Sequence, residues 1–171
     1  MRFEFATAAR IIFGPGTLRE IGPLAAEMGR RALVVIGKSA ERAAPLVEHL
    51  NGHDVKTVTF AVYREPTVEL AQHGVRQARQ SGCDMVIGFG GGSAIDAAKA
   101  IAGVATLPGT IWDYHAGRKI ERDGLPFLAV PTTAGTGAEV TKNAVLIDPR
   151  EAIKYSIRDD RWFARVAIVD P

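Results

Sequence analysis

One cysteine, Cys83, is all that the 171 residues contain. A single thiol cannot form a disulfide within the chain. The start of the sequence also lacks the apolar stretch of a signal peptide, because Glu4, Thr7 and Arg10 interrupt the residues that follow Arg2. We therefore expect a cytoplasmic protein in which Cys83 is an inert core thiol and not a nucleophile.

Long apolar runs and an excess of one charge are also missing. No window approaches the roughly 18 uninterrupted apolar residues of a membrane-spanning helix, so we expect a soluble protein. The 21 basic and 19 acidic residues nearly balance to a net charge of +2, and no basic run could follow a phosphate backbone. Neither a membrane nor a nucleic acid is therefore an expected partner.

Short apolar runs recur along the chain and predict buried strands. Hydrophobic residues make up 47% of the sequence, enough for one substantial core, so we expect one globular domain over residues 1–171. Apolar residues at helical spacing separate the runs, for instance over 18–28 and 68–78. This alternation predicts an α/β fold with a Rossmann-like, doubly wound parallel sheet. The runs are ALVVI (32–36), MVIGF (85–89), FLAV (127–130) and ARVAIV (164–169).

The first residues follow a different pattern. Apolar and charged residues alternate over 2–5, and IIF (11–13) is followed by the turn Gly14-Pro15-Gly16. We expect these two segments to form an antiparallel edge ribbon ahead of the wound sheet. Unpaired backbone groups on such an edge could join two chains by strand addition, which favours a homodimer.

Three consecutive glycines, Gly90, Gly91 and Gly92, separate the second apolar run from an alanine-rich helical pattern. Glycine lets a phosphate approach the main chain without meeting a Cβ, and a helix N-terminus adds the positive end of its dipole. Ser93 and Asp96 fit a capping box at that helix start. The turn therefore predicts a pyrophosphate site, although the glycines could also serve only a tight strand-to-helix turn. It departs from the Rossmann fingerprint, which has glycine where Ser93 stands.

A second loop, PTTAGTGAEVT (131–141), follows the third apolar run. Thr132, Thr133 and Thr136 offer hydroxyl groups there, and Glu139 fits a capping box with Thr136, which makes it a helix-start residue in preference to a catalytic acid. Because the carboxyl ends of parallel strands meet at one edge of a sheet, we expect both loops to line one ligand crevice.

Through these two loops, the sequence resembles the N-terminal, cofactor-binding half of the iron-containing alcohol dehydrogenases. GFGGGSAIDAAKAIA (88–102) and PTTAGTGAEVT carry the resemblance in that order, with ALVVIGKS (32–39) and VAIVDP (166–171) extending it to essentially the whole chain. The resemblance implies a two-domain, metal-dependent enzyme that transfers hydride between NAD(P) and a small alcohol or aldehyde.

The resemblance also implies roles for single residues. Lys154 falls where the family has a lysine that reaches the cofactor ribose, although a solvated strand residue is an equal alternative. The pyrophosphate would be held by Gly90, Gly91, Gly92 and Ser93, the nicotinamide side would face Asp96, and the adenosine and ribose portions would contact Thr132, Thr133 and Thr136.

The loop after the first apolar run bears on which cofactor is bound. It reads Gly37-Lys38-Ser39, where many NAD-preferring relatives carry an acid for the ribose 2′-hydroxyl. A small residue, a cation and a hydroxyl suit a 2′-phosphate better, because a charged donor binds phosphate strongly. We therefore favour NADP over NAD, with a plain surface role for Lys38 as the alternative.

Ligands for the family's Fe²⁺ or Zn²⁺ are not recognisable in this chain. The family's metal is held by an aspartate and three histidines of a helical second domain, which we expect to be missing from these residues. His49 and His53 are four apart, but Gly52 is expected to end their helix. Since the metal activates the alcohol, we expect these residues alone to bind a dinucleotide without turning over substrate.

Two other functions remain open at the level of sequence. A related enzyme, such as a glycerol dehydrogenase, a maleylacetate reductase or a dehydroquinate synthase-like lyase, would use the same two loops. A stand-alone nucleotide-binding module would need nothing beyond them.

Overall fold

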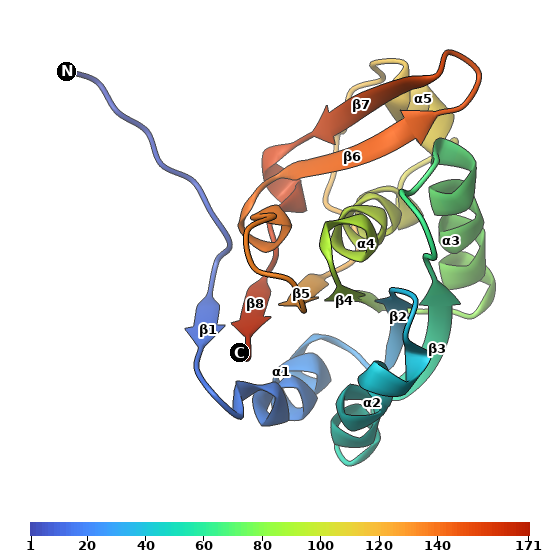
Figure 1. Cartoon of the computed structure of the whole chain (residues 1–171). Coiled ribbons are helices and arrows are strands. Elements are labelled where there is room, and N and C mark those ends of the chain that lie inside the picture. The colour runs from blue at the N-terminus through green and yellow to red at the C-terminus, as the bar shows by residue number, and fades with distance from the viewer.

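Six strands form one parallel sheet, and four of them, β2, β4, β5 and β8, are the apolar runs from which the sequence predicts it (Figure 1). The computed structural model describes residues 1–171. Every residue of β4 is buried, because this strand has neighbours on both sides and helices on both faces. The strands are β1 (Ile11–Phe13), β2 (Arg31–Ile36), β3 (Lys56–Ala61), β4 (Met85–Gly90), β5 (Phe127–Pro131) and β8 (Val166–Val169).

The order of the strands creates a reversal point in the sheet. Across the sheet the strands run β1-β8-β5-β4-β2-β3. The chain leaves β2 towards β3 on one side and leaves β4 towards β5 on the other, so its winding direction reverses between β2 and β4. The five strands β3-β2-β4-β5-β8 thus have the flavodoxin-type order of doubly wound sheets, which bind ligands beside the carboxyl ends of the two strands at the reversal.

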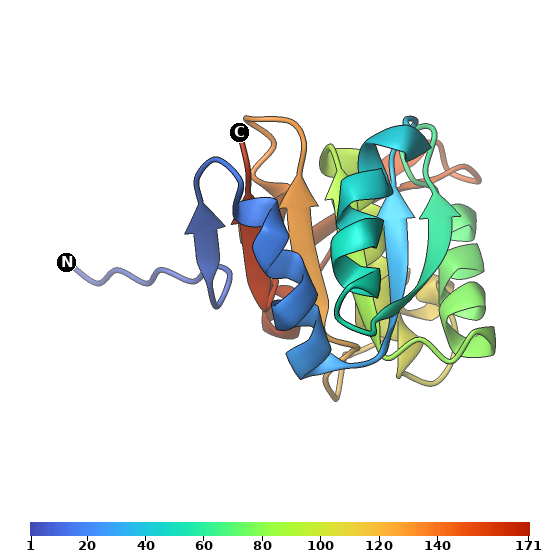
Figure 2. The ribbon, with the colours of Figure 1, turned by 90° about the horizontal axis from the view of Figure 1, so that it is seen from below.

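Helices cover both faces of the sheet and divide the core into two apolar clusters (Figures 1 and 2). On one face lie α1 (Ile21–Met28) and α2 (Ala44–Asn51), and on the other lie α3 (Val68–Gln80), α4 (Gly92–Ala105) and α5 (Ile111–His115). Thr67 caps α3 by accepting a hydrogen bond from the Leu70 N–H. Gly52 is the C-cap of α2, which therefore ends where the sequence predicts. Short 3-10 turns cover Thr17–Glu20, Ala40–Ala43, Ala138–Val140 and Asp160–Trp162.

An antiparallel pair, β6 (Asn143–Asp148) and β7 (Ile153–Arg158), lies outside the main sheet. It packs over the outer side of α4, so this helix is enclosed between the sheet and the pair (Figure 1). Ten of the 14 residues of α4 are buried, which its many alanines allow.

The expected N-terminal antiparallel ribbon is wrong. Residues 2–5 belong to no strand, and β1 pairs in parallel with β8, with Ile12 opposite Ile168. The turn at Gly14 to Gly16 leads into α1 and does not fold back, because the carboxylate of Asp170 accepts hydrogen bonds from the backbone of Gly16 and Leu18 (both 2.9 Å). β1 therefore finds its partner at the far end of the sequence.

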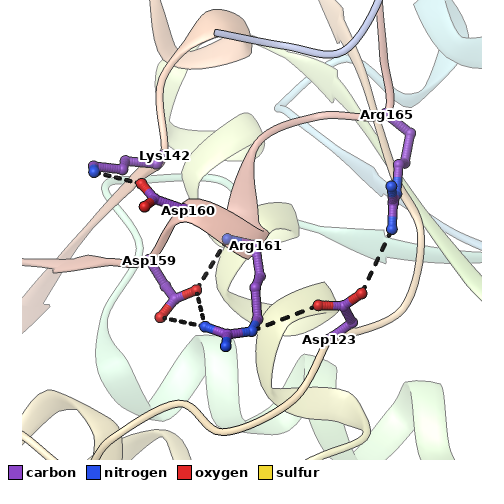
Figure 3. A network of polar contacts seen from close by, with 6 residues as sticks. All are labelled: Asp123, Lys142, Asp159, Asp160, Arg161 and Arg165. Atoms are coloured by element: carbon purple, nitrogen blue, oxygen red, sulfur yellow. Dashed lines mark hydrogen bonds and ion pairs between the residues drawn. The ribbon is translucent and has the colours of Figure 1, made fainter. Parts of the chain in front are cut away.

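Ion pairs gather at the amino ends of β5 and β8 (Figure 3). Arg161 binds Asp159 (Nη1 to Oδ1, 3.0 Å) and Asp123 (Nε to Oδ1, 3.6 Å), and Asp123 also pairs with Arg165 (3.7 Å). Most of these side chains are exposed, so each pair contributes about 0–1 kcal/mol to stability. The network joins the loop before β5 to the segment before β8, at the end of the strands opposite their carboxyl ends.

None of the helices combines the length and the apolar character that crossing a membrane requires.

Gly103 of α4 is predicted to be essential for packing, because a Cβ there would overlap the indole of the buried Trp162. We expect Gly103→Ala to lower the free energy of unfolding by about 1–3 kcal/mol, although alanine is the better helix former. Urea denaturation measures the change. Gly52→Ala at the exposed end of α2 is the control, because a Cβ there makes only ordinary contacts, and equal stability of the two variants would contradict the prediction.

Candidate functional site

The two loops singled out in the sequence lie against each other at the carboxyl edge of the sheet. A Cβ on Gly91 would lie 3.3 Å from Oγ1 of Thr133, and one on Gly92 would lie 3.4 Å from Cβ of Thr136. The Thr132 N–H also donates to the Gly90 carbonyl (2.9 Å). The structure thus confirms that the two loops share one edge, while the roles of their residues stay predictions.

The first loop brings three backbones close together. Gly90 has φ 152°, and a Cβ on it would lie 2.9 Å from Cβ of Ala94 and 3.3 Å from the backbone N of Gly37. Only glycine fits this approach of β4, α4 and the loop after β2. Gly91 is the N-cap of α4 and no side chain caps it. The backbone N–H groups of the first turn of this 14-residue helix therefore face the loop without a side-chain acceptor.

The expected capping box of Ser93 and Asp96 is not formed. Helix α4 begins at Gly92, so Ser93 is already its second residue and cannot act as the cap. The run of glycines includes both the N-cap, Gly91, and the first residue of the helix, Gly92, whereas the motif predicts that the helix begins after Ser93. Ser93 lines the same cavity as Gly92 and Thr133.

A cavity of about 420 Å³ lies at the reversal point of the sheet. Gly37 and Lys38 line it from the end of β2, Arg64 from the loop after β3, and Gly91 to Ser93 from the end of β4. Lys38 and Arg64 are exposed and form no ion pair. Ser39, the third residue of the predicted loop, follows Lys38 at the surface and does not line the cavity.

A second cavity of about 450 Å³ lies on the other side of the second loop. Phe13, Leu18 and Phe89 give it apolar walls, and Thr132 and Thr133 form part of its rim. Because Thr133 lines both cavities, the two spaces lie on either side of one loop. Arg42, Glu139 and Asp170 also line the second cavity, so charged side chains border both spaces along the same edge.

The second loop differs from its expected local structure. Thr136 and Glu139 form no capping box, since Gly137 precedes the 3-10 turn and the Thr136 hydroxyl accepts only a long hydrogen bond from the Ala138 N–H (3.5 Å). Oε2 of Glu139 is buried and has no hydrogen-bond partner. Glycines at 135 and 137 have φ of 101° and 65°, which keeps this segment from continuing as an α-helix.

Asp96 lies below the first loop, between α4 and the β6–β7 pair. Burial raises the pKa of its carboxyl to about 6, against the lowering by Lys99 and by the backbone N–H of Val145. Lys99 is not among the residues that the sequence motifs predict for the site. A lysine within the buried, alanine-rich face of a helix was the available signal, because an unpaired ammonium group is rarely buried.

Lys154 lies on β7, exposed, where it forms an ion pair with Glu65. Glu65 lines the cavity at the reversal point. The structure therefore brings Lys154 to the rim of that cavity. This contact is compatible with both predicted roles, a lysine that reaches the cofactor ribose and a solvated strand residue.

No group of three or more His, Cys, Asp or Glu side chains is placed to hold a metal ion. His49 lies in α2 and His53 beyond its end, so they do not form a pair on one helix. The residues present do not fit a metal, and we assign them no metal-dependent step.

A doubly wound parallel sheet with a glycine loop (Gly90 to Gly92) and a helix N-terminus without a side-chain cap at its reversal point is the arrangement at which α/β folds bind nucleotides. The model of the family described as iron-containing alcohol dehydrogenase matches residues 8–171. The chain therefore belongs to the iron-containing alcohol dehydrogenase family and corresponds to the N-terminal half of its members.

Known relatives are alcohol dehydrogenases and related reductases. The chain is 37% identical to long-chain-alcohol dehydrogenase 1 of Geobacillus thermodenitrificans, over 96% of this chain and 45% of that protein. It is 36% identical to the NAD-dependent methanol dehydrogenase of Bacillus methanolicus, over 94% and 43%. The structure of sulfoacetaldehyde reductase from Bifidobacterium kashiwanohense in complex with NAD⁺ superposes with a TM-score of 0.87 at 33% identity, over 100% of this chain and 46% of that one. The chain thus spans less than half the length of the relatives it matches.

Proposed function

We propose that this chain is the cofactor-binding half of a metal-dependent alcohol dehydrogenase, which transfers hydride between a nicotinamide dinucleotide and a small alcohol or aldehyde. The observation that carries the proposal is the contact between the glycine loop and the second loop, residues 131–141, which we call the threonine loop, at the reversal point of the sheet. The names of two relatives, an NAD-dependent dehydrogenase and a reductase bound to NAD⁺, support the choice of ligand.

The two cavities suggest how the dinucleotide lies. Its pyrophosphate would meet the N-terminus of α4 at Gly90 to Ser93, where backbone N–H groups and the helix dipole favour an anion. The adenosine would extend over Thr132 and Thr133 into the second cavity, against its apolar wall, and Thr136 would contact a ribose. Asp96 would support the nicotinamide side from below the loop, and Lys154 would reach a ribose from the rim.

Activation of the alcohol would fall to residues other than these 171, because no metal ligand set lies among them. Glycerol dehydrogenase-like, maleylacetate reductase-like and dehydroquinate synthase-like activities would use the same loops, but the names of the relatives favour an alcohol or aldehyde. A stand-alone nucleotide-binding module is the remaining alternative. We place the protein in the cytoplasm, since its one cysteine is a buried free thiol.

Replacing Gly91 by alanine tests the site. The added methyl group would shield the backbone N–H groups at the start of α4, so we expect the Kd for NADH to rise by about tenfold. The fold should persist, because the nearest neighbour is the exposed side chain of Thr133. Titration followed by nicotinamide fluorescence gives the Kd, with Gly52→Ala as the control. An unchanged Kd in Gly91→Ala, or a wild-type protein that binds neither NADH nor NADPH, would refute the proposed function.

We also propose a preference for NADP, because Lys38 and Arg64 stand without ion pairs in the cavity at the reversal point. We expect Lys38→Glu to weaken NADPH binding about tenfold more than NADH binding, since a carboxylate repels the 2′-phosphate. Lys56→Glu is the control. Lys56 lies at the start of β3, at the end of the strand away from Arg64, so this change should leave the Kd values for NADPH and NADH unchanged. Tighter binding of NADH than of NADPH by the wild-type protein would contradict the preference.

A homodimer is the third part of the proposal. Phe3, Phe5 and Phe13 are exposed by 82%, 74% and 73%, and β1 pairs with only one strand, which leaves its outer backbone edge free. We expect sedimentation analysis to give a dimer for the wild-type protein and a monomer for the double variant Phe3→Ser, Phe5→Ser. Ile153→Ser, on the exposed β6–β7 pair, should leave the dimer intact, and a monomeric wild-type protein would rule the dimer out.

A further inference from the structure

The β6–β7 pair has one occupied edge and one open edge. On the outer side of β6, the Ile147 N–H donates to the carbonyl of Pro66 (2.9 Å), and the carbonyl of Asn143 accepts a hydrogen bond from Nζ of Lys99 (2.8 Å). β7 has no neighbouring strand other than β6. The open edge of the pair is therefore that of β7.

The register of the pair identifies the backbone groups on this open edge. In an antiparallel pair, every second pair of opposed residues points its N–H and C=O groups away from the other strand. The Ile147 N–H points to Pro66, so Ile147 and Lys154 form such a pair, and the same holds for the pairs of Ser156 and Arg158. The backbone groups of these three β7 residues therefore point outwards, and no hydrogen bond of the structure reaches them.

A cavity of about 740 Å³ lies along the open edge. Residues 154–159 line it from β7 and its end, and residues 117–120 line it from the segment that follows α5. Six residues of a strand extend over about 20 Å. We call this space the β7 groove, since one of its walls is a strand edge whose hydrogen-bonding groups are unused.

Positive charge predominates in the β7 groove, which is lined by four cations and one carboxylate. The carboxylate, Asp159, is bound to Arg161 (Nη1 to Oδ1, 3.0 Å). Among the cations, only Lys154 forms an ion pair, with the exposed Glu65. The groove therefore favours an anionic partner. Its four cations are Arg118, Lys119, Lys154 and Arg158.

The two faces of β7 differ in chemistry, because alternate side chains of a strand point to opposite faces. Tyr155 and Ile157 lie opposite fully buried residues of β6, on the face that packs over α4. The side chains of Lys154, Ser156 and Arg158 lie on the other face. A strand placed beside β7 therefore meets apolar groups on one face and basic or polar groups on the other.

We propose that the β7 groove binds an extended acidic peptide of a partner protein, which adds to β7 as a third strand. The main chain of the peptide bonds to the outward groups of Lys154, Ser156 and Arg158. Its acidic side chains alternate with apolar ones, so that the acids lie beside the cations and the apolar groups lie beside Tyr155 and Ile157.

The charges of the groove also decide against a second copy of β7 as the added strand. Such a copy brings Lys154 and Arg158 against like charges, which disfavours the pairing. The inference is independent of dinucleotide binding, because no residue of the glycine loop or the threonine loop lines the groove.

The first experiment uses a fluorescein-labelled peptide of alternating glutamate and valine residues. Fluorescence anisotropy should show saturable binding to the protein. A peptide of alternating lysine and valine should bind about tenfold more weakly, because its charges are repelled. A glutamate–valine peptide with N-methylated backbone amides keeps the charge but loses donors, and should also bind about tenfold more weakly. Equal binding of the unmodified and the N-methylated peptide, or no binding of the unmodified one, overturns the proposal.

Two substitutions separate the contributions of backbone and charge. Ser156→Pro removes an outward N–H and no hydrogen bond to β6, so the fold should persist while the Kd for the glutamate–valine peptide rises by about tenfold. Lys119→Glu, on the opposite wall, should raise this Kd by about tenfold. Lys56→Glu, at the start of β3, is the control and should leave it unchanged. An unchanged Kd in either Ser156→Pro or Lys119→Glu contradicts the proposal.

Amide hydrogen exchange of the wild-type protein, followed by NMR, gives a readout at single residues that no variant can confound. Without peptide, the N–H groups of Lys154, Ser156 and Arg158 should exchange faster than those of Tyr155 and Ile157, which face β6. Saturation with the glutamate–valine peptide should slow the three outward groups by about tenfold. Bound peptide without this slowing overturns strand addition. Failure to bind NADH leaves this inference intact and contradicts only the proposed function.

Discussion

Close packing of α4 between the main sheet and the β6–β7 pair fixes where its N-terminus points. Small residues make this packing possible: a Cβ on Gly88 of β4 would lie 2.9 Å from Cβ of Ala98, and Gly103 leaves room for Trp162 on the other side. A helix that is enclosed on both sides cannot shift without disturbing two layers of the molecule. The glycine loop gains its rigid support in this way, and Lys99 joins the same helix to the backbone of residues 138–143 through three hydrogen bonds.

The basic side chains at the two ends of the strands differ in whether they form ion pairs. At the amino ends of β5 and β8, Arg161 and Arg165 are paired with Asp123 and other carboxylates (Figure 3). At the carboxyl ends, Lys38 and Arg64 have no such partners and stand beside the start of α4. Two cations without ion pairs therefore stand at the reversal point beside the positive end of the α4 dipole, an arrangement that favours an anion. Asp96 and Glu139 lie deeper and offset the charge of Lys99.

Patterns within short stretches of sequence predict much of this structure, whereas contacts between distant residues do not. The apolar runs give the strands β2, β4, β5 and β8 and their parallel arrangement, because strands buried on both faces need continuous apolar residues. Residues 2–5 show the limit: their alternation suits a strand, but no neighbouring strand is available to pair with them. The site followed the same rule. Its two loops can be recognised as sequence motifs. The hydrogen bonds of Lys99 to three carbonyl groups cannot, because they depend on where β6 lies. The predicted capping boxes at Ser93 and Thr136 do not form, because glycines determine where each helix begins.

The pairing of β1 with β8 also has a consequence for how the protein forms. The backbone N–H of Gly16 and the carboxylate of Asp170 that receives it are 154 residues apart in sequence. During synthesis from the N-terminus, this edge of the sheet has no partner until the residues of β8 have left the ribosome. Contacts of such long sequence separation carry a large loop-closure cost and slow folding. Closure of this edge is therefore a late event, and until then the exposed phenylalanines beside β1 are open to encounters with other nascent chains.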